Sequence, residues 1–307
     1  MVLSTGRYSL SFALIAVGAV WAGAINLAAQ SGGEAGSSPQ VDLNVLVIDK
    51  SGTPVTSLEG SDFRVTVDGT PQTIQSAVAG DAPISVAFVI DTSGSMYRQR
   101  SAITAIVTAV AQALPRGSEI AAIEFSDTPH IEQQLAPVAG NSLSVLQHLD
   151  ARGCTALLDA VMEGERLLAG QAHNPRRALI LIGDGGDNCS THSIQESDRT
   201  IQQPGAPALY SFVLVPVVRN GTSPAEQGAQ VMKSLVRMSG AVVFAPRKER
   251  DFTPALAALV AAIRSQYVLT FTAAHPDRDG SRHTLEMRLP GRNLSIFGLP
   301  AYFAPED

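Results

Sequence analysis

Hydrophobic positions near the start of the folded chain alternate with polar ones. Every second residue over 41–47 is apolar, which is typical of a strand with one exposed face. A second strand pattern covers residues 62–74, and Asp68-Gly69 within it is typical of a hairpin turn. Residues 40–82 are therefore predicted to form an all-β segment.

From residue 84 onward, apolar runs alternate with helical patterns. The runs predict strands buried on both faces, at residues 84–90, 120–125, 177–184, 208–217 and 241–246. In the segments between and after these runs, apolar residues recur at the spacing of a helix; these segments are residues 102–114, 156–170, 225–240 and 253–266. This alternation predicts an α/β domain over 83–266, with a doubly wound, mainly parallel sheet and helices on both faces.

Strand patterns return after residue 266. Neither the leading segment, 40–82, nor the trailing segment, 267–307, is long enough to build a good core alone. We therefore expect the two to pair in one small β-sandwich, with the α/β domain inserted between them. The alternative is two separate flaps packed on the α/β domain.

The N-terminal residues have the order of a targeting sequence. Arg7 precedes an apolar run over 10–29, and small residues follow at 22–24, as in a secretory signal peptide. A retained membrane anchor through residues 8–29 is the alternative, because about 20 apolar residues can span a bilayer. Residues 30–39 are predicted to be a flexible linker. Both interpretations place the folded part outside the cytoplasm, either secreted or in the cell envelope.

Composition narrows the class of protein. With 45% hydrophobic and 16% charged residues among 307, the chain is typical of a globular protein. The formal net charge of -6 gives no basic surface for nucleic acid. Two cysteines exclude a disulfide-rich scaffold and a four-cysteine zinc site.

Five oxygen-bearing side chains stand in three segments, each expected at the carboxyl end of a strand. They are Asp91, Ser93, Ser95, Thr155 and Asp184. In an open α/β sheet, ligands bind outside the carboxyl ends of the strands, so distant loops can converge there. Carboxylates and hydroxyls are hard donors that suit Mg²⁺, Mn²⁺ or Ca²⁺. Gly94 and Gly153 are expected to supply the backbone freedom that these loops need.

This arrangement resembles the metal-ion-dependent adhesion site of von Willebrand factor type A domains, over residues 84–266. The resemblance implies direct coordination by Ser93, Ser95 and Thr155. It also implies that Asp91 and Asp184 act partly through water, and that a Glu or Asp of a partner protein often completes the coordination. The flanking β segments look like those of a bacterial secreted group in this family.

One position departs from the family pattern. Gly183 stands where the family usually has threonine before the aspartate of the third loop. We expect this difference to tune the loop and to leave the site intact.

The expected function is that of a secreted, adhesion-like binding module, not an enzyme. Two alternatives stay open: a structural component of an envelope assembly with a static metal, and a phosphatase-like metal enzyme. Phosphatase chemistry requires a second carboxylate two positions after Asp91, and Ser93 stands there instead. A further alternative for the first loop is that Asp91 and Ser95 only cap the following helix. The six histidines show no ligand spacing.

The two cysteines lie beside the predicted metal loops. Cys154 immediately precedes Thr155, and Cys189 follows Asp184 by five positions. If both loops face one ion, the cysteines are close enough for a disulfide that joins the loops. Two separate, unreactive thiols are the alternative.

Overall fold

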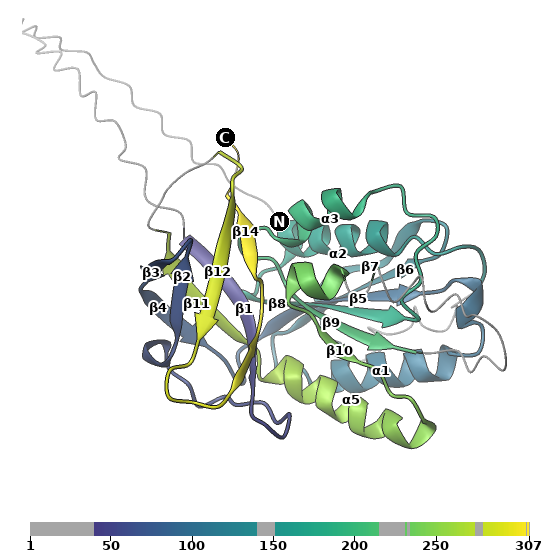
Figure 1. Cartoon of the computed structure of the whole chain (residues 1–307). Coiled ribbons are helices and arrows are strands. Elements are labelled where there is room, and N and C mark those ends of the chain that lie inside the picture. The colour runs from purple at the N-terminus through teal and green to yellow at the C-terminus, as the bar shows by residue number, and fades with distance from the viewer. Residues whose placement is uncertain are drawn as a thin grey trace, which may run out of the picture. The chain divides into compact units, whose positions relative to one another are not determined.

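The computed structural model contains one six-stranded sheet flanked by helices and two four-stranded sheets (Figure 1). The structure describes residues 40–139, 151–214, 231, 234–273, 279–304 and 306. The predicted signal peptide or anchor, 1–29, and the predicted linker, 30–39, lie outside these residues. Among the described residues, no helix is both long and apolar enough to cross a membrane.

The six-stranded sheet has the order β10-β9-β8-β5-β6-β7. Its strands are β5 (Ile84–Asp91), β6 (Glu119–Phe125), β7 (Pro129–Pro137), β8 (Arg176–Gly183), β9 (Ala208–Val213) and β10 (Val242–Phe244). All neighbours are parallel except β6 and β7. The doubly wound, mainly parallel sheet is thus confirmed. Strand β7 was not predicted, because an edge strand bounded by prolines lacks the continuous apolar run of its buried neighbours.

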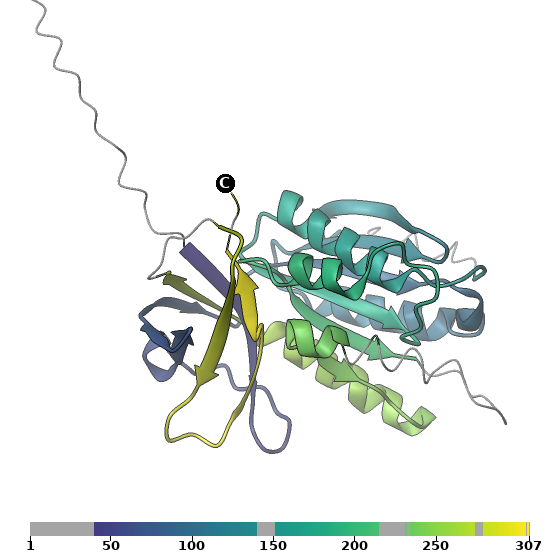
Figure 2. The same ribbon diagram turned by 45° about the horizontal axis from the view of Figure 1, so that its top comes forward.

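Helices cover both faces of this sheet (Figures 1 and 2). Helices α1 (Arg100–Ala113) and α5 (Glu249–Arg264) share one buried core with the sheet, and α2 (Leu157–Gln171) and α3 (Ile194–Ile201) share the other. The apolar stripe predicted on the last helix packs into the first core, through residues such as Leu259. Within the helix predicted over 225–240, the structure describes residues 231 and 234–240, and all of these except residue 240 are helical.

One helix begins earlier than expected, and another was not predicted. Helix α5 begins at Glu249, four residues earlier than predicted, and includes Pro254. Helix α3 was missed because its eight residues are mostly polar. Its start is stabilised by a capping box, in which Ser193 accepts a hydrogen bond from the amide of Glu196 while the Glu196 side chain bonds the Ser193 amide.

The two ends of the chain pair with each other, which confirms the predicted β-sandwich. One sheet has the order β13-β1-β11-β4 and the other β14-β12-β2-β3. The strands from the leading segment are β1 (Gln40–Ile48), β2 (Arg64–Val67), β3 (Thr70–Gln72) and β4 (Ile74–Val78). The strands from the trailing segment are β11 (Tyr267–Thr272), β12 (Arg282–Arg288), β13 (Ser295–Phe297) and β14 (Ala301–Phe303). A single hydrophobic core lies between the sheets.

The hairpin turn between β2 and β3 is confirmed in detail. Asp68 and Gly69 both have positive φ, 47° and 80°. Two such residues in succession are what a type I′ turn requires, and aspartate tolerates this region better than most residues.

A buried polar cluster joins the sandwich to the α/β domain. The amide of Asn44 on β1 donates to the carbonyl of Ala206 at 2.8 Å. Its oxygen accepts from the Gln266 amide at 2.6 Å, and Gln266 in turn accepts from the Tyr210 hydroxyl at 3.1 Å. Gln266 lies between α5 and β11. The cluster therefore holds in place the point where the chain passes from the α/β domain into the β-sandwich.

Candidate metal centre

Asp91 ends strand β5, and its carboxylate is fully buried. Oδ1 accepts a hydrogen bond from the amide of Ser93 at 2.8 Å. Oδ2 has no hydrogen-bond partner among the residues that the structure describes. The hydroxyl oxygens of Ser93 and Ser95 lie 3.1 Å apart on the same loop. The first loop thus presents one unpartnered carboxylate oxygen and two neighbouring hydroxyls.

The electrostatic environment of Asp91 is unfavourable for a lone carboxylate. Burial raises the pKa of Asp91 to about 6, and the negative charge of Asp184 adds to the effect, although hydrogen bonds from Ser93 oppose it. Asp184 directly follows β8, and Asp91 is the last residue of the neighbouring parallel strand β5, so the two carboxylates lie at the same edge of the sheet and interact. A group that neutralises both would relieve this repulsion.

Gly183 makes room for the buried aspartate. A Cβ atom placed on Gly183 would lie 2.7 Å from Cβ of Asp91 and 2.9 Å from its Oδ2. Both distances are shorter than real contacts allow. The absence of a side chain at 183, the one departure from the family pattern, therefore determines where the Asp91 carboxylate can lie in this protein.

Thr155 reaches the site differently from the prediction. It does not follow a strand, because residues 151–156 form a loop that leads directly into α2. Backbone hydrogen bonds hold this loop against the others: the Ala156 amide donates to the Ser126 carbonyl at 2.8 Å, and the Arg152 amide donates to the Thr92 carbonyl at 2.9 Å. The second loop is thus anchored to the ends of β6 and β5.

The two glycines singled out in the loops differ in what they do. Gly153 has φ of +79°, and an added Cβ would lie 2.3 Å from Oδ1 of Asp127, so only glycine fits there. Gly94 has no positive φ, and its nearest neighbour to an added Cβ is the Gly153 carbonyl oxygen at 3.7 Å. The expectation that Gly94 supplies backbone freedom is therefore wrong.

The second and third loops hold each other in place. The Thr155 amide donates to Oδ1 of Asn188 at 2.8 Å, and the Asn188 amide donates to the Thr155 carbonyl at 2.9 Å. The Leu158 amide, in the first turn of α2, donates to Asp187 and to the Ser190 hydroxyl. Since the preceding Ala156 has no side chain that can cap α2, the third loop caps the helix in its place.

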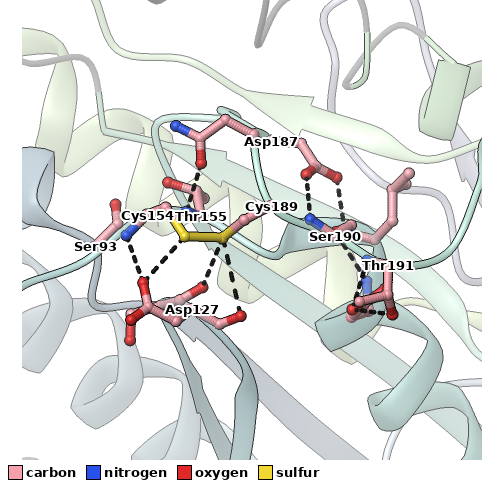
Figure 3. The surroundings of a disulfide bond; sticks show 12 residues. Ser93, Asp127, Cys154, Thr155, Asp187, Cys189, Ser190 and Thr191 are labelled. Carbon is pink, nitrogen blue, oxygen red and sulfur yellow. Dashed lines mark hydrogen bonds between the residues drawn. A yellow bond between two sulfur atoms is a disulfide. The ribbon is translucent and has the colours of Figure 1, made fainter.

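A disulfide between Cys154 and Cys189 joins these same loops (Figure 3). The Cα atoms are 6.2 Å apart, and the prediction of this bond is confirmed. Asp127, which the sequence did not indicate, lies against it, and its Oδ1 accepts a hydrogen bond from the Cys154 amide at 2.7 Å. Nothing in the sequence pattern marks Asp127, because only the fold brings the β6–β7 turn to the disulfide.

The sequence profile of the von Willebrand factor type A domain matches residues 86–186, a stretch that includes all five predicted metal-site residues. The chain contains a von Willebrand factor type A domain. No curated protein sequence matches the chain.

Several solved structures resemble the protein at low sequence identity. Proximal thread matrix protein 1 from the mussel byssus is 16% identical with a TM-score of 0.50, covering 64% of this chain and 50% of that chain. A von Willebrand factor type A protein from Catenulispora acidiphila is 13% identical with a TM-score of 0.47, covering 89% and 76%. The PilB minor pilin from Streptococcus sanguinis is 14% identical with a TM-score of 0.48, covering 61% of this chain and 62% of the pilin. The chain thus spans less than two thirds of the pilin.

The capping alternative for the first loop of the type A domain is wrong for α1. The N-cap residue of α1 is Gln99, and no side chain caps it. Between Ser95 and α1 lie a 3-10 turn (Gly94–Met96) and an irregular segment. Neither Asp91 nor Ser95 is therefore used as a cap of this helix.

A cavity of about 390 Å³ adjoins the first loop of the type A domain. Its lining includes Asp91, Met96, Tyr97 and Arg100. Tyr97 is 76% exposed, although large aromatic side chains are usually at least partly covered. The surroundings of the buried carboxylate therefore combine an exposed aromatic ring with a basic side chain.

Proposed function

We propose that this protein is an extracytoplasmic, non-enzymatic binding module that holds one divalent cation in its type A domain and recognises an acidic group of a partner protein through it. The observation that carries this proposal is the fully buried Asp91, whose Oδ2 has no hydrogen-bond partner among the described residues and which interacts with a second carboxylate, Asp184. Burying a charge without a partner is costly, and such groups are usually paired or bind metals.

The residues present suit a hard cation. Asp91, Ser93, Ser95, Thr155 and Asp184 would hold it, and all five offer oxygen donors. Mg²⁺ is the expected ion, with Mn²⁺ or Ca²⁺ as alternatives that the same donors accept. When bound, the cation supplies a positive centre for an oxygen ligand. The hydrogen bonds and the disulfide described above keep the three loops in place around it.

The partner chemistry follows from the charge balance and the surface. Of the five oxygen donors only the two carboxylates, Asp91 and Asp184, can carry a negative charge. A divalent cation held by them and by neutral hydroxyls would keep its affinity for a further anionic oxygen ligand. Arg100 in the adjoining cavity favours an acidic group further, and the exposed ring of Tyr97 offers apolar contact around it. A Glu or Asp side chain of a partner protein has the matching chemistry.

The disulfide supports a location outside the cytoplasm. Disulfides persist in oxidising compartments and are rare in the cytosol. The Cys154–Cys189 bond therefore supports a secreted or cell-envelope protein, with membrane tethering through residues 8–29 as a variant of the same proposal.

A static metal in an envelope scaffold is the second candidate, and the compact loops favour it. The β6–β7 turn, the disulfide and the capping of α2 by the third loop fix the site from several sides. A site held this firmly could serve stability alone. Phosphatase chemistry has less support, since Ser93 stands where it needs a carboxylate.

Water-proton relaxation measured with bound Mn²⁺ can distinguish a cation that binds an acidic partner from a cation with a purely structural role. Mn²⁺ bound with an exchangeable water enhances water-proton relaxation, and a ligand that replaces that water lowers the enhancement. We expect a short blocked peptide containing Glu to lower it and the matched Gln peptide to leave it unchanged. An unchanged signal with both peptides would support the static metal. Mn²⁺ binding that survives in Asp91→Asn would contradict the assigned site.

A further inference from the structure

A second cavity lies at the other end of the central sheet. It has a volume of about 350 Å³, and its lining includes Arg177 near the start of β8 and Pro207 just before β9. The metal loops follow the opposite, carboxyl ends of the strands. Ala169, on the last turns of α2, and Pro204 add apolar wall. This cavity is therefore separate from the candidate metal centre.

A buried acid forms part of the lining of this cavity. Glu165 is 4% exposed, and its Oε1 has no hydrogen-bond partner within the described part of the chain. Burial raises the pKa of Glu165 well above its usual range and so favours its neutral form. Oε1 is therefore a buried polar atom whose hydrogen-bonding capacity is not used by the described residues.

Three arginines also line the cavity: Arg166, Arg177 and Arg199. Arg199 pairs with Glu306 and lies over the ring of Phe303 at 4.9 Å, and Arg166 pairs with Glu163 at 3.8 Å. Arg177 donates to the carbonyl of Asn174 and has no carboxylate partner within the described part of the chain, so its positive charge is the one that favours an anion here.

The segment that forms one wall of the cavity, residues 203–207, is held in place by the protein itself. Residues 203–207 read Gln-Pro-Gly-Ala-Pro, and the two prolines restrict the backbone. The Gly205 amide donates to the Asp42 carbonyl at 3.1 Å, and the Ala206 carbonyl accepts from the Asn44 side chain. Both partners belong to β1 of the sandwich. Preorganised walls reduce the ordering cost of binding.

We propose that this cavity binds a small organic anion with an apolar body. The body contacts Ala169 and Pro204, the anionic end faces Arg177, and a donor group of the ligand bonds Oε1 of Glu165. The observations that carry the assignment are the buried, unpartnered acid, the basic lining and the preformed apolar wall. This inference does not depend on the metal site.

Two fluorescent probes that differ by one group test the proposal. 8-Anilino-1-naphthalenesulfonate has an apolar body, an N–H donor and a sulfonate, and N-phenyl-1-naphthylamine is the same molecule without the sulfonate. We expect saturable one-site binding of the sulfonate and binding of the neutral probe that is weaker by about tenfold. In Arg177→Gln the difference between the probes shrinks to about twofold, because the charge that distinguishes them is gone.

A cavity-filling variant locates the binding. Ala169 is exposed on α2, so Ala169→Trp places a large ring at the cavity without disturbing the core, and it should abolish one-site binding of both probes. Ala258→Trp, an equally exposed alanine on α5, is the matched control and should bind like the wild type. Glu165→Leu should weaken both probes equally, since both carry the N–H group.

Three outcomes would overturn the proposal: no saturable binding to folded wild type, equal affinity for the two probes, or unchanged binding in Ala169→Trp. Near-ultraviolet circular dichroism of each variant shows whether it is folded, because the sulfonate probe also binds partly unfolded proteins. Adding EDTA or introducing Asp91→Asn should leave probe binding unchanged. The metal proposal and the anion proposal can therefore fail independently.

Discussion

Replacing Gly183 by alanine should weaken cation binding without unfolding the protein. The added methyl group would lie 2.7 Å from Cβ of Asp91 and 2.9 Å from its Oδ2, so the Asp91 side chain has to move. Overpacking of a buried site costs about 1–3 kcal/mol. If this cost falls on the geometry that binds the ion, affinity drops by about tenfold to a hundredfold, because about 1.4 kcal/mol corresponds to a factor of ten.

Gly94→Ala is the matched control for this prediction. It adds the same methyl group to a neighbouring metal loop, but its nearest contact is 3.7 Å away and its φ is not positive. We expect its cation affinity to stay within about twofold of wild type. Calorimetric titration with Mg²⁺ and Mn²⁺ measures both variants, and thermal melts in EDTA show that both are folded. Equal affinities for folded Gly183→Ala and Gly94→Ala would refute the reasoning about Asp91.

Three further predictions concern the surroundings of the site. Burial raises the pKa of Asp159, but hydrogen bonds from Thr191 and His192 outweigh this effect and lower the pKa to about 2. The ionised carboxylate therefore stabilises the folded protein fully above the pKa that Asp159 has in the unfolded chain, and this stabilisation is lost as the pH falls through about 2. Asp159→Asn should therefore cost about 2 kcal/mol in urea unfolding at pH 7 and clearly less at pH 3, and a pH-independent difference would contradict this linkage. A thiol assay on the unreduced protein should find no free thiol. The Cys154→Ser/Cys189→Ser double variant should lose about 3–4 kcal/mol of stability, and an unchanged melting temperature would contradict a stabilising role of the disulfide. Tyr97→Ala should leave Mg²⁺ affinity unchanged and weaken capture of a Glu-containing peptide by about threefold or more, and a loss of metal affinity instead would assign the ring to the site itself.

The central sheet could be predicted because its strands are buried on both faces. Strands β5 and β8 are near-continuous apolar runs, as is typical of strands buried on both faces of a parallel sheet. Edge strand β7 and helix α3 escaped prediction because their stability comes from pairing and capping, which leave little apolar pattern. The pattern of apolar positions therefore predicts the helices and strands of the core and misses elements at the periphery.

The candidate site was predictable where strand ends determine position. Asp91 and Asp184 follow neighbouring parallel strands, so topology alone places them together. Thr155 was expected at the end of a strand, but it lies in a loop that backbone hydrogen bonds hold against the ends of β5 and β6. The role of Asp127 beside the disulfide depends on tertiary contacts that local sequence does not encode.

The burial of Glu165 beside the second cavity is another feature that depends on tertiary contacts and could not be predicted from local sequence. Glu165 lies in a helix whose sequence predicts its polar residues on an exposed face, yet the side chain is 4% exposed. The cavity that Glu165 lines is bounded by α3 and by the segment after it, and α3 has little apolar pattern in its sequence.

Calorimetric titration of the purified protein with Mg²⁺, Mn²⁺ and Ca²⁺, alongside Asp91→Asn and Asp184→Asn, tests the central claim most directly. Asparagine keeps the shape of each side chain and removes its charge, so the fold should survive, and circular dichroism can verify that. We expect one saturable cation site in the wild type that both variants lose. Absence of binding to folded wild type, or binding that persists in both variants, would contradict it.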